Sequence, residues 1–423
     1  MFRNYLKIAW KVLGRNKFFT IVSLFGISFT IGILLVLSTF FDNMFNANYP
    51  EGNRDRSLYI VELELTDGKD DYWMGTPSAL FINNYVKQLK TPQVVGLISR
   101  PFENNSNAFV SGKKLSLAVR RTCNNFWKIS TFDFLEGSPY QKQQIDNSER
   151  VAVITQSTKS AYFGDTDSVI GQMIEIEGGR YKVMGVVRDV SSTQVFTYAD
   201  VYLPYTGTDI GNVSKDIIGE YIGILMGSSA ADVPKIREEY QAMINRMEIP
   251  VPSDPYFEKF KTINSDTETL LEFIATKQFF QFADKSEAVR NLFTMLIGAM
   301  ILFMLLPALN LVNLNASRIS ERSSEIGIRK AFGATVPNLM IQFLVENILL
   351  TLIGGLLGLL LAIGILQIIK ASELFAPFNF TINYRVFLIA LVLSVFFGIL
   401  SGVLPARRMA KFQIVNALKG KQL

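Results

Sequence analysis

A run of 24 residues without a charged side chain, Phe18–Phe41, constrains this sequence more than any other feature. As a helix it would be roughly 36 Å long, enough to cross a hydrocarbon core of about 30 Å. The alternative is a cleaved signal peptide, whose apolar region is only about 7–15 residues long and ends at a small-residue cleavage site. This run is longer and continues into Asp42 and Asn43, so we expect a retained membrane span over residues 18–41.

Three more apolar segments lie in the C-terminal third of the chain. They are residues 291–317, 336–369 and 386–406, and only the second contains a charged side chain, Glu346. We predict that the second, third and fourth spans lie in residues 286–317, 336–369 and 386–406. The range 286–317 also includes the end of a stalk that precedes the second span. The composition agrees with a membrane protein, because 19% of the residues are charged against about 25% in soluble domains.

The first two spans are separated by a long polar insert, residues 42–285. Short strand patterns alternate there with turn signals. Residues 59–65 alternate apolar and polar side chains, residues 151–154 are apolar, and residues 173–187 have a hairpin pattern with two central glycines. The insert is therefore expected to contain a folded domain with a sheet.

Helical patterns at residues 78–89 and 233–247 flank these strands, and Pro234 suits the first turn of the second helix. We predict an α+β domain of two lobes, with one lobe, about 116–210, inserted in the other. The predicted fold class is an α-helical membrane protein with four transmembrane helices and this two-lobed extracytoplasmic domain inserted between helices 1 and 2.

Basic residues are concentrated in three short segments that alternate with the predicted spans. Residues 1–17, 318–335 and 407–423 together contain 14 Lys or Arg and 2 Asp or Glu, whereas the remainder contains 28 basic and 35 acidic residues. Short cytoplasmic loops are enriched in Lys and Arg. We therefore predict that the two termini and the 318–335 loop are cytoplasmic and that the insert lies on the other side of the membrane.

Residues 1–17 also have the pattern of an amphipathic helix, with a basic stripe beside an apolar one. The basic side chains are Arg3, Lys7, Lys11 and Arg15, and the apolar ones are Phe2, Leu6, Trp10 and Leu13. Such a helix suits the surface of an anionic inner leaflet, with membrane lipids as its partner. The alternative is a charged flank that only fixes the topology.

The residue types exclude several classes of enzyme. The sequence has no histidine and a single cysteine, Cys123, which excludes Ser-His-Asp and Cys-His nucleophile systems and multi-cysteine metal sites. It has no GxxxxGK[ST] phosphate loop, and its basic pairs are scattered among acids, unlike a nucleic-acid interface. We assign no catalytic residue, no metal ligand and no bound cofactor to this chain, and we expect no nucleic-acid partner.

The loop between the second and third spans, residues 318–335, has a regular charge pattern. Glu321 and Glu325 are four residues apart, as are Arg318 and Arg322, so a helix would have a mixed-charge face. Such a helix suits a groove on a cytoplasmic protein. The alternative is an ordinary positively charged loop.

Small residues four apart occur in the third and fourth predicted spans. They are Gly354 and Gly358 in the third and Gly398 and Gly402 in the fourth. Small residues at this spacing let helices approach closely. We predict that these glycines pack helices together, either within one chain or between two copies.

Several motifs resemble those of the MacB/FtsX-like permeases of ABC transporters. The stretch EIGIRKAFGAT at residues 325–335 carries the resemblance most clearly, and GVLPA at 402–406 agrees with it. In the insert, residues 150–154 and 181–187 are similar to the periplasmic core domain of that family. The resemblance spans nearly the whole chain. Ile414 departs from it, because the family often has proline there.

The resemblance implies a pair of permeases, either a homodimer or two paralogues, in a bacterial inner membrane, working with a separate ABC ATPase subunit that holds ATP and magnesium. Residues 318–335 are then the coupling loop on that subunit. By this analogy the contact residues are Glu321, Glu325, Arg329, Lys330 and Gly333. Residues 266–290 are either a stalk that extends the second span or a packed helix of the domain.

Two functions agree with these features. The first is mechanotransmission, in which ATP hydrolysis in the partner subunit changes the periplasmic domain and drives export or efflux of a peptide, a lipoprotein or a hydrophobic small molecule. The alternative is a regulator that transports nothing and activates a periplasmic partner such as a cell-wall hydrolase. A periplasmic adaptor is a further possible partner for the first function.

Overall fold

A computed structural model describes residues 2–15, 17–101, 105–110, 113–176, 178–205, 217–250, 255–280, 283–321, 328, 332, 335–371 and 384–410. These residues divide into two compact units. The helical unit contains residues up to Asp42 and from Asn291 onward, and the α/β unit contains Asn43–Arg290.

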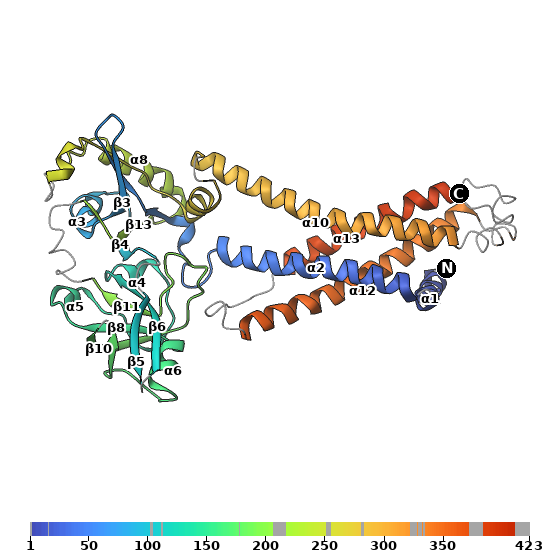
Figure 1. Ribbon diagram of the computed structural model, residues 1–423, viewed down its shortest axis with the longest axis horizontal. Coiled ribbons are helices and arrows are strands. Elements are labelled where there is room, and N and C mark those ends of the chain that lie inside the picture. Colours follow the sequence, from blue (N-terminus) through green and yellow to red (C-terminus); the bar gives the residue numbers. More distant parts are fainter. Residues whose placement is uncertain are drawn as a thin grey trace. The chain divides into compact units, whose positions relative to one another are not determined.

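The helical unit is built from long helices (Figure 1). They are α1 (Phe2–Arg15), α2 (Lys17–Phe45), α10 (Lys285–Glu321), α12 (Val336–Ala371) and α13 (Tyr384–Ala410). Among the described residues, three helical stretches are long and apolar enough to cross a membrane: Lys17–Asp42, Lys285–Phe303 and Met340–Ala371. The described apolar part of α13, Tyr384–Phe396, is shorter.

Helices α2 and α12 approach each other closely because glycines lie at their contact. A Cβ added to Gly358 would lie 2.8 Å from the backbone oxygen of Ser28, and one added to Gly354 would lie 2.7 Å from the Ile27 side chain. Both distances are shorter than van der Waals contact, so only a residue without a Cβ fits. The first predicted glycine pair thus faces α2 of the same chain.

Two apolar clusters hold the helices together. Ile27, Ile31 and Leu35 of α2 pack against Ala362 of α12, and Leu34 of α2 packs against Ala390 of α13 with Met300 of α10 beside them. Helix α2 therefore packs against α12 and α13 within this unit.

Substitution of Gly358 tests this close contact. Gly358→Leu forces its side chain against the α2 backbone, and overpacking of this kind costs about 1–3 kcal/mol. We expect a lower thermal unfolding midpoint for the full chain in detergent. The matched control is Gly364→Leu on the same helix, where nothing lies within 4 Å of the added Cβ, and we expect its midpoint to equal or exceed that of the wild type. Equal losses for both variants would contradict the contact.

The α/β unit contains a mixed ten-stranded sheet and a four-stranded sheet. The strands of the larger sheet are β1 (Ser57–Ile60), β4 (Val94–Ser99), β5 (Asn105–Val110), β6 (Lys113–Thr122), β7 (Phe134–Gly137), β8 (Val151–Thr155), β9 (Met173–Ile176), β10 (Gly179–Val187), β11 (Val201–Pro204) and β13 (Tyr221–Met226). Their order is β1-β13-β4-β6-β11-β8-β10-β7, with β5 beside β6 and β9 beside β10. The smaller sheet has the order β12-β3-β2-β14, with bounds Ile218–Gly219, Tyr72–Pro77, Leu63–Thr66 and Thr262–Ser265.

Short helices connect these strands. The α-helices are α3 (Ala79–Asn84), α4 (Phe126–Ile129), α5 (Lys142–Asp146), α6 (Gln156–Phe163), α8 (Val233–Ile244) and α9 (Leu270–Ile274). Single 3₁₀ turns are η1 (Arg54–Arg56), η2 (Val86–Gln88), η3 (Ala230–Asp232) and η4 (Pro255–Lys259), and η5 (Ala275–Phe279) is a turn of π-helix. The predicted hairpin is confirmed by the antiparallel β9 and β10, and the helix at 233–247 by α8, whose first turn holds Pro234.

One strand prediction is wrong. Residues 59–65 do not form one strand, because β1 pairs with β13 in the larger sheet whereas β2 pairs with β3 and β14 in the smaller one. The chain leaves the first sheet at Val61 and Glu62, and Glu62 is ion-paired to Lys277. The alternation of apolar residues is real, but it continues across a change of sheet.

The C-terminal part of the insert, residues 266–290, was expected to be either a stalk or a packed helix of the domain. Leu270 and Ile274 of α9 are buried in the main apolar cluster of the α/β unit, and α10 begins only at Lys285. Residues 270–274 therefore form a packed helix of the domain. Residues 285–290 belong to α10, which continues into the second predicted span, and their role as the end of a stalk stays a prediction. Phe282 lies outside the described residues.

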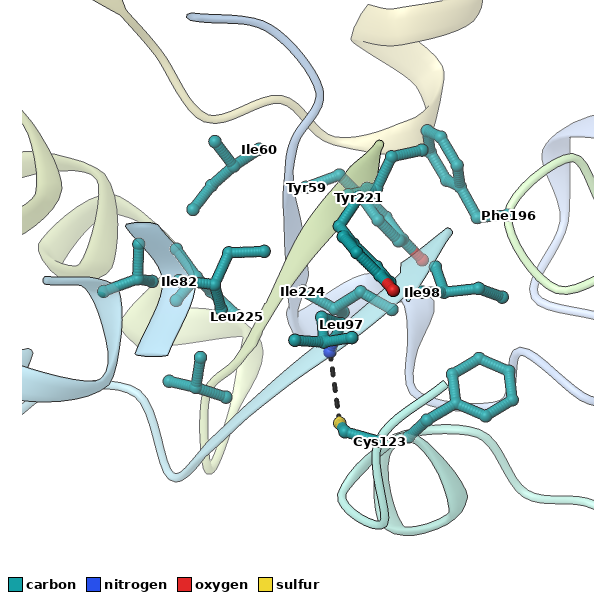
Figure 2. Packing of buried hydrophobic residues seen from close by; sticks show 14 of the residues in the cluster. Tyr59, Ile60, Ile82, Leu97, Ile98, Cys123, Phe196, Tyr221, Ile224 and Leu225 are labelled. Atoms are coloured by element: carbon teal, nitrogen blue, oxygen red, sulfur yellow. Dashed lines mark hydrogen bonds between the residues drawn. The ribbon is translucent and has the colours of Figure 1, made fainter. Parts of the chain in front are cut away.

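The core of the α/β unit also explains the lone cysteine. Cys123 is 2% exposed in the main cluster, and the backbone N–H of Leu97 donates a hydrogen bond to its Sγ at 3.2 Å (Figure 2). Burial raises the pKa of the Cys123 thiol, so the side chain remains a neutral packing group. A second cluster, which includes Ile154, Ile174 and Val186, lies between β8, β9 and β10.

Candidate functional site

The last turn of α2 is held by a buried arginine. The Arg54 Nη1 donates to the backbone oxygens of Met44, at 3.1 Å, and Asn46, at 2.7 Å. Carbonyls at the end of a helix lack partners within the helix and carry partial negative charge, which a cation stabilises. Arg54 thus binds carbonyl oxygens at the end of α2 that have no hydrogen-bond donor within α2.

The charge of Arg54 is compensated inside the α/β unit. Its Nε donates to the Glu51 carboxylate at 2.8 Å, its Nη2 contacts Glu51 and the side-chain oxygen of Gln194, and Thr197 donates to the other oxygen of Glu51 at 2.7 Å. Arg54 is 9% exposed and Glu51 3%. A buried ion pair is stable only when such additional hydrogen bonds are present. We call these four residues, Glu51, Arg54, Gln194 and Thr197, the α2 anchor.

The first residue of α10 is also bound by charge. Lys285 Nζ lies 2.6 Å from Asp266 and 3.4 Å from Glu268, and it donates to the backbone oxygen of Thr267 at 3.2 Å. Carboxylates are favoured near a helix N-terminus. Burial acts to raise the pKa of Asp266, but hydrogen bonds from Lys285 and Gln241 outweigh it and hold that pKa below its usual value. We call Asp266, Glu268 and Lys285 the α10 anchor.

Both anchors lie within the α/β unit, which includes the end of α2 and the beginning of α10. They fix the two points where the chain enters and leaves that unit. Chemically the arrangement binds helix ends through charge and hydrogen bonds. Among the described residues, no group of three or more His, Cys, Asp or Glu side chains has the geometry of a metal site.

The predicted coupling residues are described only in part. Glu321 is the last residue of α10, and its side chain is not described. The other four, Glu325, Arg329, Lys330 and Gly333, lie outside the described residues. Their role stays a prediction.

The remaining predicted positions lie on α12 and α13. Gly354 and Gly358 face α2, as described above. Gly398 and Gly402 lie on α13, whose surroundings at those positions are not described. Glu346 of α12 is 1% exposed and accepts a hydrogen bond from Gln342 at 3.1 Å.

The α2 anchor is a feature that was not predicted from the sequence. A usable signal was present, since Glu51 and Arg54 stand three residues apart shortly after the first span. Gln194 and Thr197 are 140 and 146 residues from their partners, and no sequence pattern indicates that contact.

Comparison with known proteins agrees with this architecture. The family model for the MacB-like periplasmic core domain matches residues 20–242, and that for the FtsX-like permease C-terminal domain matches residues 297–414. A macrolide export ATP-binding/permease protein MacB of Acinetobacter baylyi is 25% identical over 98% of this chain and 57% of its own length. The ABC transporter permease YknZ of Bacillus subtilis is 24% identical over 80% of this chain and 79% of its own.

Solved structures are also similar to this chain. One of them is the crystal structure of the periplasmic region of MacB from Actinobacillus actinomycetemcomitans, with 14% identity, a TM-score of 0.38, and coverage of 57% of this chain and 99% of that one.

The periplasmic core domain match alone covers more than half of the chain. The chain belongs to the MacB/FtsX-like family of ABC transporter permeases. It is an inner-membrane protein with a periplasmic domain of α/β fold, and it spans 57% of the length of the Acinetobacter relative.

Substitution of Arg54 tests the α2 anchor. Arg54→Met removes the buried cation and leaves Glu51 charged and unpaired, which costs about 3–5 kcal/mol. Cys123 is the only thiol in the chain and is buried in this unit. Its reaction with a maleimide in increasing urea therefore reports unfolding of the unit, and we expect labelling at lower urea concentration in the variant.

The matched control is Lys142→Met, which breaks the exposed ion pair with Asp146, whose side chains are 74% and 55% exposed. Surface pairs contribute about 0–1 kcal/mol, so its labelling curve should overlay that of the wild type. If Arg54→Met also overlays it, the anchor does not stabilise the unit.

Proposed function

We propose that this chain is the permease subunit of an ABC-type mechanotransmission complex. ATP hydrolysis in a separate ATPase subunit would change the conformation of the periplasmic domain and drive export or efflux of a peptide, a lipoprotein or a hydrophobic small molecule. The observation that carries the proposal is the joint match of the periplasmic core domain and the permease C-terminal domain, in that order. The name of the Acinetobacter relative, a macrolide exporter, supports a hydrophobic small molecule as one substrate.

The proposed topology has four spans, at residues 18–41, 286–317, 336–369 and 386–406, and cytoplasmic termini. The support is the charge distribution, because the segments at 1–17, 318–335 and 407–423 hold 14 basic and 2 acidic residues. The periplasmic core domain is proposed to extend over residues 42–285, with its second lobe at about 116–210.

In this proposal the loop at 318–335 seats on the ATPase. Glu321, Glu325, Arg329, Lys330 and Gly333 make the contact, and ATP with magnesium is bound by the partner subunit. Two permeases, identical or paralogous, work together in the complex. A periplasmic adaptor would receive the exported molecule.

The two anchors support a mechanical route. Helix α2 ends in the carbonyls that Arg54 binds, and α10 begins at Lys285 between two carboxylates. A rigid helix with a fixed end transmits displacement instead of absorbing it. Movement of α2 and α10 on ATP binding is therefore proposed to reach the periplasmic domain through the α2 anchor and the α10 anchor.

Charge reversal in the loop tests the contact with the ATPase. The variant Glu325→Lys with Arg329→Glu exchanges the two charges and keeps the net charge. A loss of binding would therefore show that the positions of the two charges matter, and not only the net charge. We expect the ATPase that co-purifies with the detergent-solubilised wild type to be lost, together with the ATPase activity of the sample.

The control exchanges an exposed pair of the α/β unit, Lys142→Glu with Asp146→Lys, and should retain the ATPase. Retention of the ATPase by the loop variant would contradict the assignment of the loop. A complex that hydrolyses ATP and exports no tested substrate, while a cell-wall hydrolase depends on it, would favour the regulatory alternative.

A further inference from the structure

A short turn between β10 and β11, residues 194–198, supplies two members of the α2 anchor. Gln194 contacts Arg54, and Thr197 donates to the Glu51 carboxylate at 2.7 Å. Both side chains are buried, at 0% and 2% exposed. We call residues 194–198 the bridge segment, because the same turn also contacts residues that support the α10 anchor.

That second contact is made by the ring of Phe196. It stacks on Tyr59 of β1, with ring centroids 4.2 Å apart, and its centroid lies 4.9 Å from that of Phe273 in α9 (Figure 2 includes Tyr59 and Phe196). Tyr59 exchanges two backbone hydrogen bonds with Glu268, at 2.7 and 2.8 Å, and Glu268 is paired to Lys285. Phe196 therefore packs against the strand residue that holds Glu268 in place.

A buried arginine of β6 fixes the bridge segment. Arg120 is 4% exposed and donates to the backbone oxygens of Val195, at 2.7 Å, and Tyr198, at 3.3 Å. It also donates to the backbone oxygen of Ser99. Burial lowers the pKa of Arg120 to about 10, so the guanidinium stays charged at neutral pH and a buried charge needs such acceptors. The bridge segment is thus held firmly to the larger sheet.

These contacts form a continuous series from the end of α2 to the beginning of α10. The series passes from Arg54 through the bridge segment to Tyr59, and then through Glu268 to Lys285. Apart from Lys285, the side chains that make these contacts are buried. Close-packed interiors transmit strain, and residues in one contact network contribute to stability non-additively. A change at one helix end is therefore expected to alter the stability of the other.

We propose that the bridge segment couples the two anchors, so that loosening the beginning of α10 also loosens the end of α2. The attachments of the two helices to the periplasmic domain then change together and not one at a time. The proposal goes beyond the proposed function and does not depend on it, because the coupling belongs to the chain without its ATPase.

Hydrogen exchange, measured by mass spectrometry on the full chain in detergent and without ATPase, tests the coupling. Lys285→Met removes the cation of the α10 anchor, and the readout is exchange at residues 46–56, where the backbone N–H groups of Glu51 and Arg54 are hydrogen-bonded. Exchange reports local opening. We expect it to become at least about twofold faster there, which corresponds to the weakest coupling usual within one contact network.

The matched control applies the same substitution to a different ion pair of the α/β unit. Lys259→Met breaks the pair of Lys259 with Asp71, which lies beside the smaller sheet. Lys259 is not a member of the series described above. Exchange at residues 46–56 should therefore equal that of the wild type.

A second variant tests whether the bridge segment carries the coupling. Phe196→Leu keeps an apolar side chain and removes the stacked ring. In this background we expect Lys285→Met to cause no further acceleration at residues 46–56. Exchange of the β9–β10 hairpin, which belongs to the second apolar cluster, checks that the Phe196→Leu protein is folded.

If Phe196→Leu does not fold, Phe273→Leu replaces it with the same expected direction, because Phe273 is only partly buried and contacts Phe196 from α9. Three results would each overturn the proposal. They are unchanged exchange at residues 46–56 in Lys285→Met, the same acceleration in Lys259→Met, and an undiminished effect of Lys285→Met in the folded background that lacks the ring.

Discussion

The anchoring of α2 depends on how Arg54 distributes its donors. Two of its hydrogen bonds go to backbone oxygens at the end of α2, and the others go to Glu51 and Gln194. A guanidinium has five N–H donors in a fixed plane, so it joins these acceptors in one geometry. Loss of Arg54 would leave the buried Glu51 carboxylate without its cation and the carbonyls at the end of α2 without a donor.

The α10 anchor is of a different kind. The side chain of Lys285 is 23% exposed and that of Asp266 39%, so water can replace part of the interaction. Helix α2 is fixed again within the helical unit, where Gly354 and Gly358 let α12 approach it. Of the two helix ends within the α/β unit, that of α2 is therefore bound by the more deeply buried ion pair.

Much of the fold could be predicted from the sequence because its signals are local. A charge-free run of 24 residues indicates a long apolar helix, and α2 is that helix. The hairpin of β9 and β10 and the helix α8 follow from turn residues and a proline within a few positions. The prediction of a single strand at residues 59–65 was wrong, because the alternation of apolar and polar residues continues where the chain passes from one sheet to the other.

Apart from the local spacing of Glu51 and Arg54, the contacts that form the anchors could not be predicted, because they join residues from separate elements. Arg54 meets Gln194, and Lys285 meets Asp266 and Glu268 from beyond α9. Only the fold brings these residues together, and a single sequence contains no pattern for such contacts. The four coupling-loop residues from Glu325 to Gly333 were identified through family resemblance, and their role remains a prediction.

The central claim is that ATP-driven movement reaches the periplasmic domain through these helices. The most direct measurement is the distance between spin labels at Glu238→Cys in the α/β unit and Ile368→Cys on α12, both exposed positions, in a Cys123→Ser chain within the complete complex in nanodiscs. Double electron–electron resonance would compare the nucleotide-free complex with one trapped with ATP and vanadate, labelled chains being diluted with unlabelled ones. The account predicts a shifted distance distribution on trapping. Superimposable distributions in a complex that still hydrolyses ATP would contradict it.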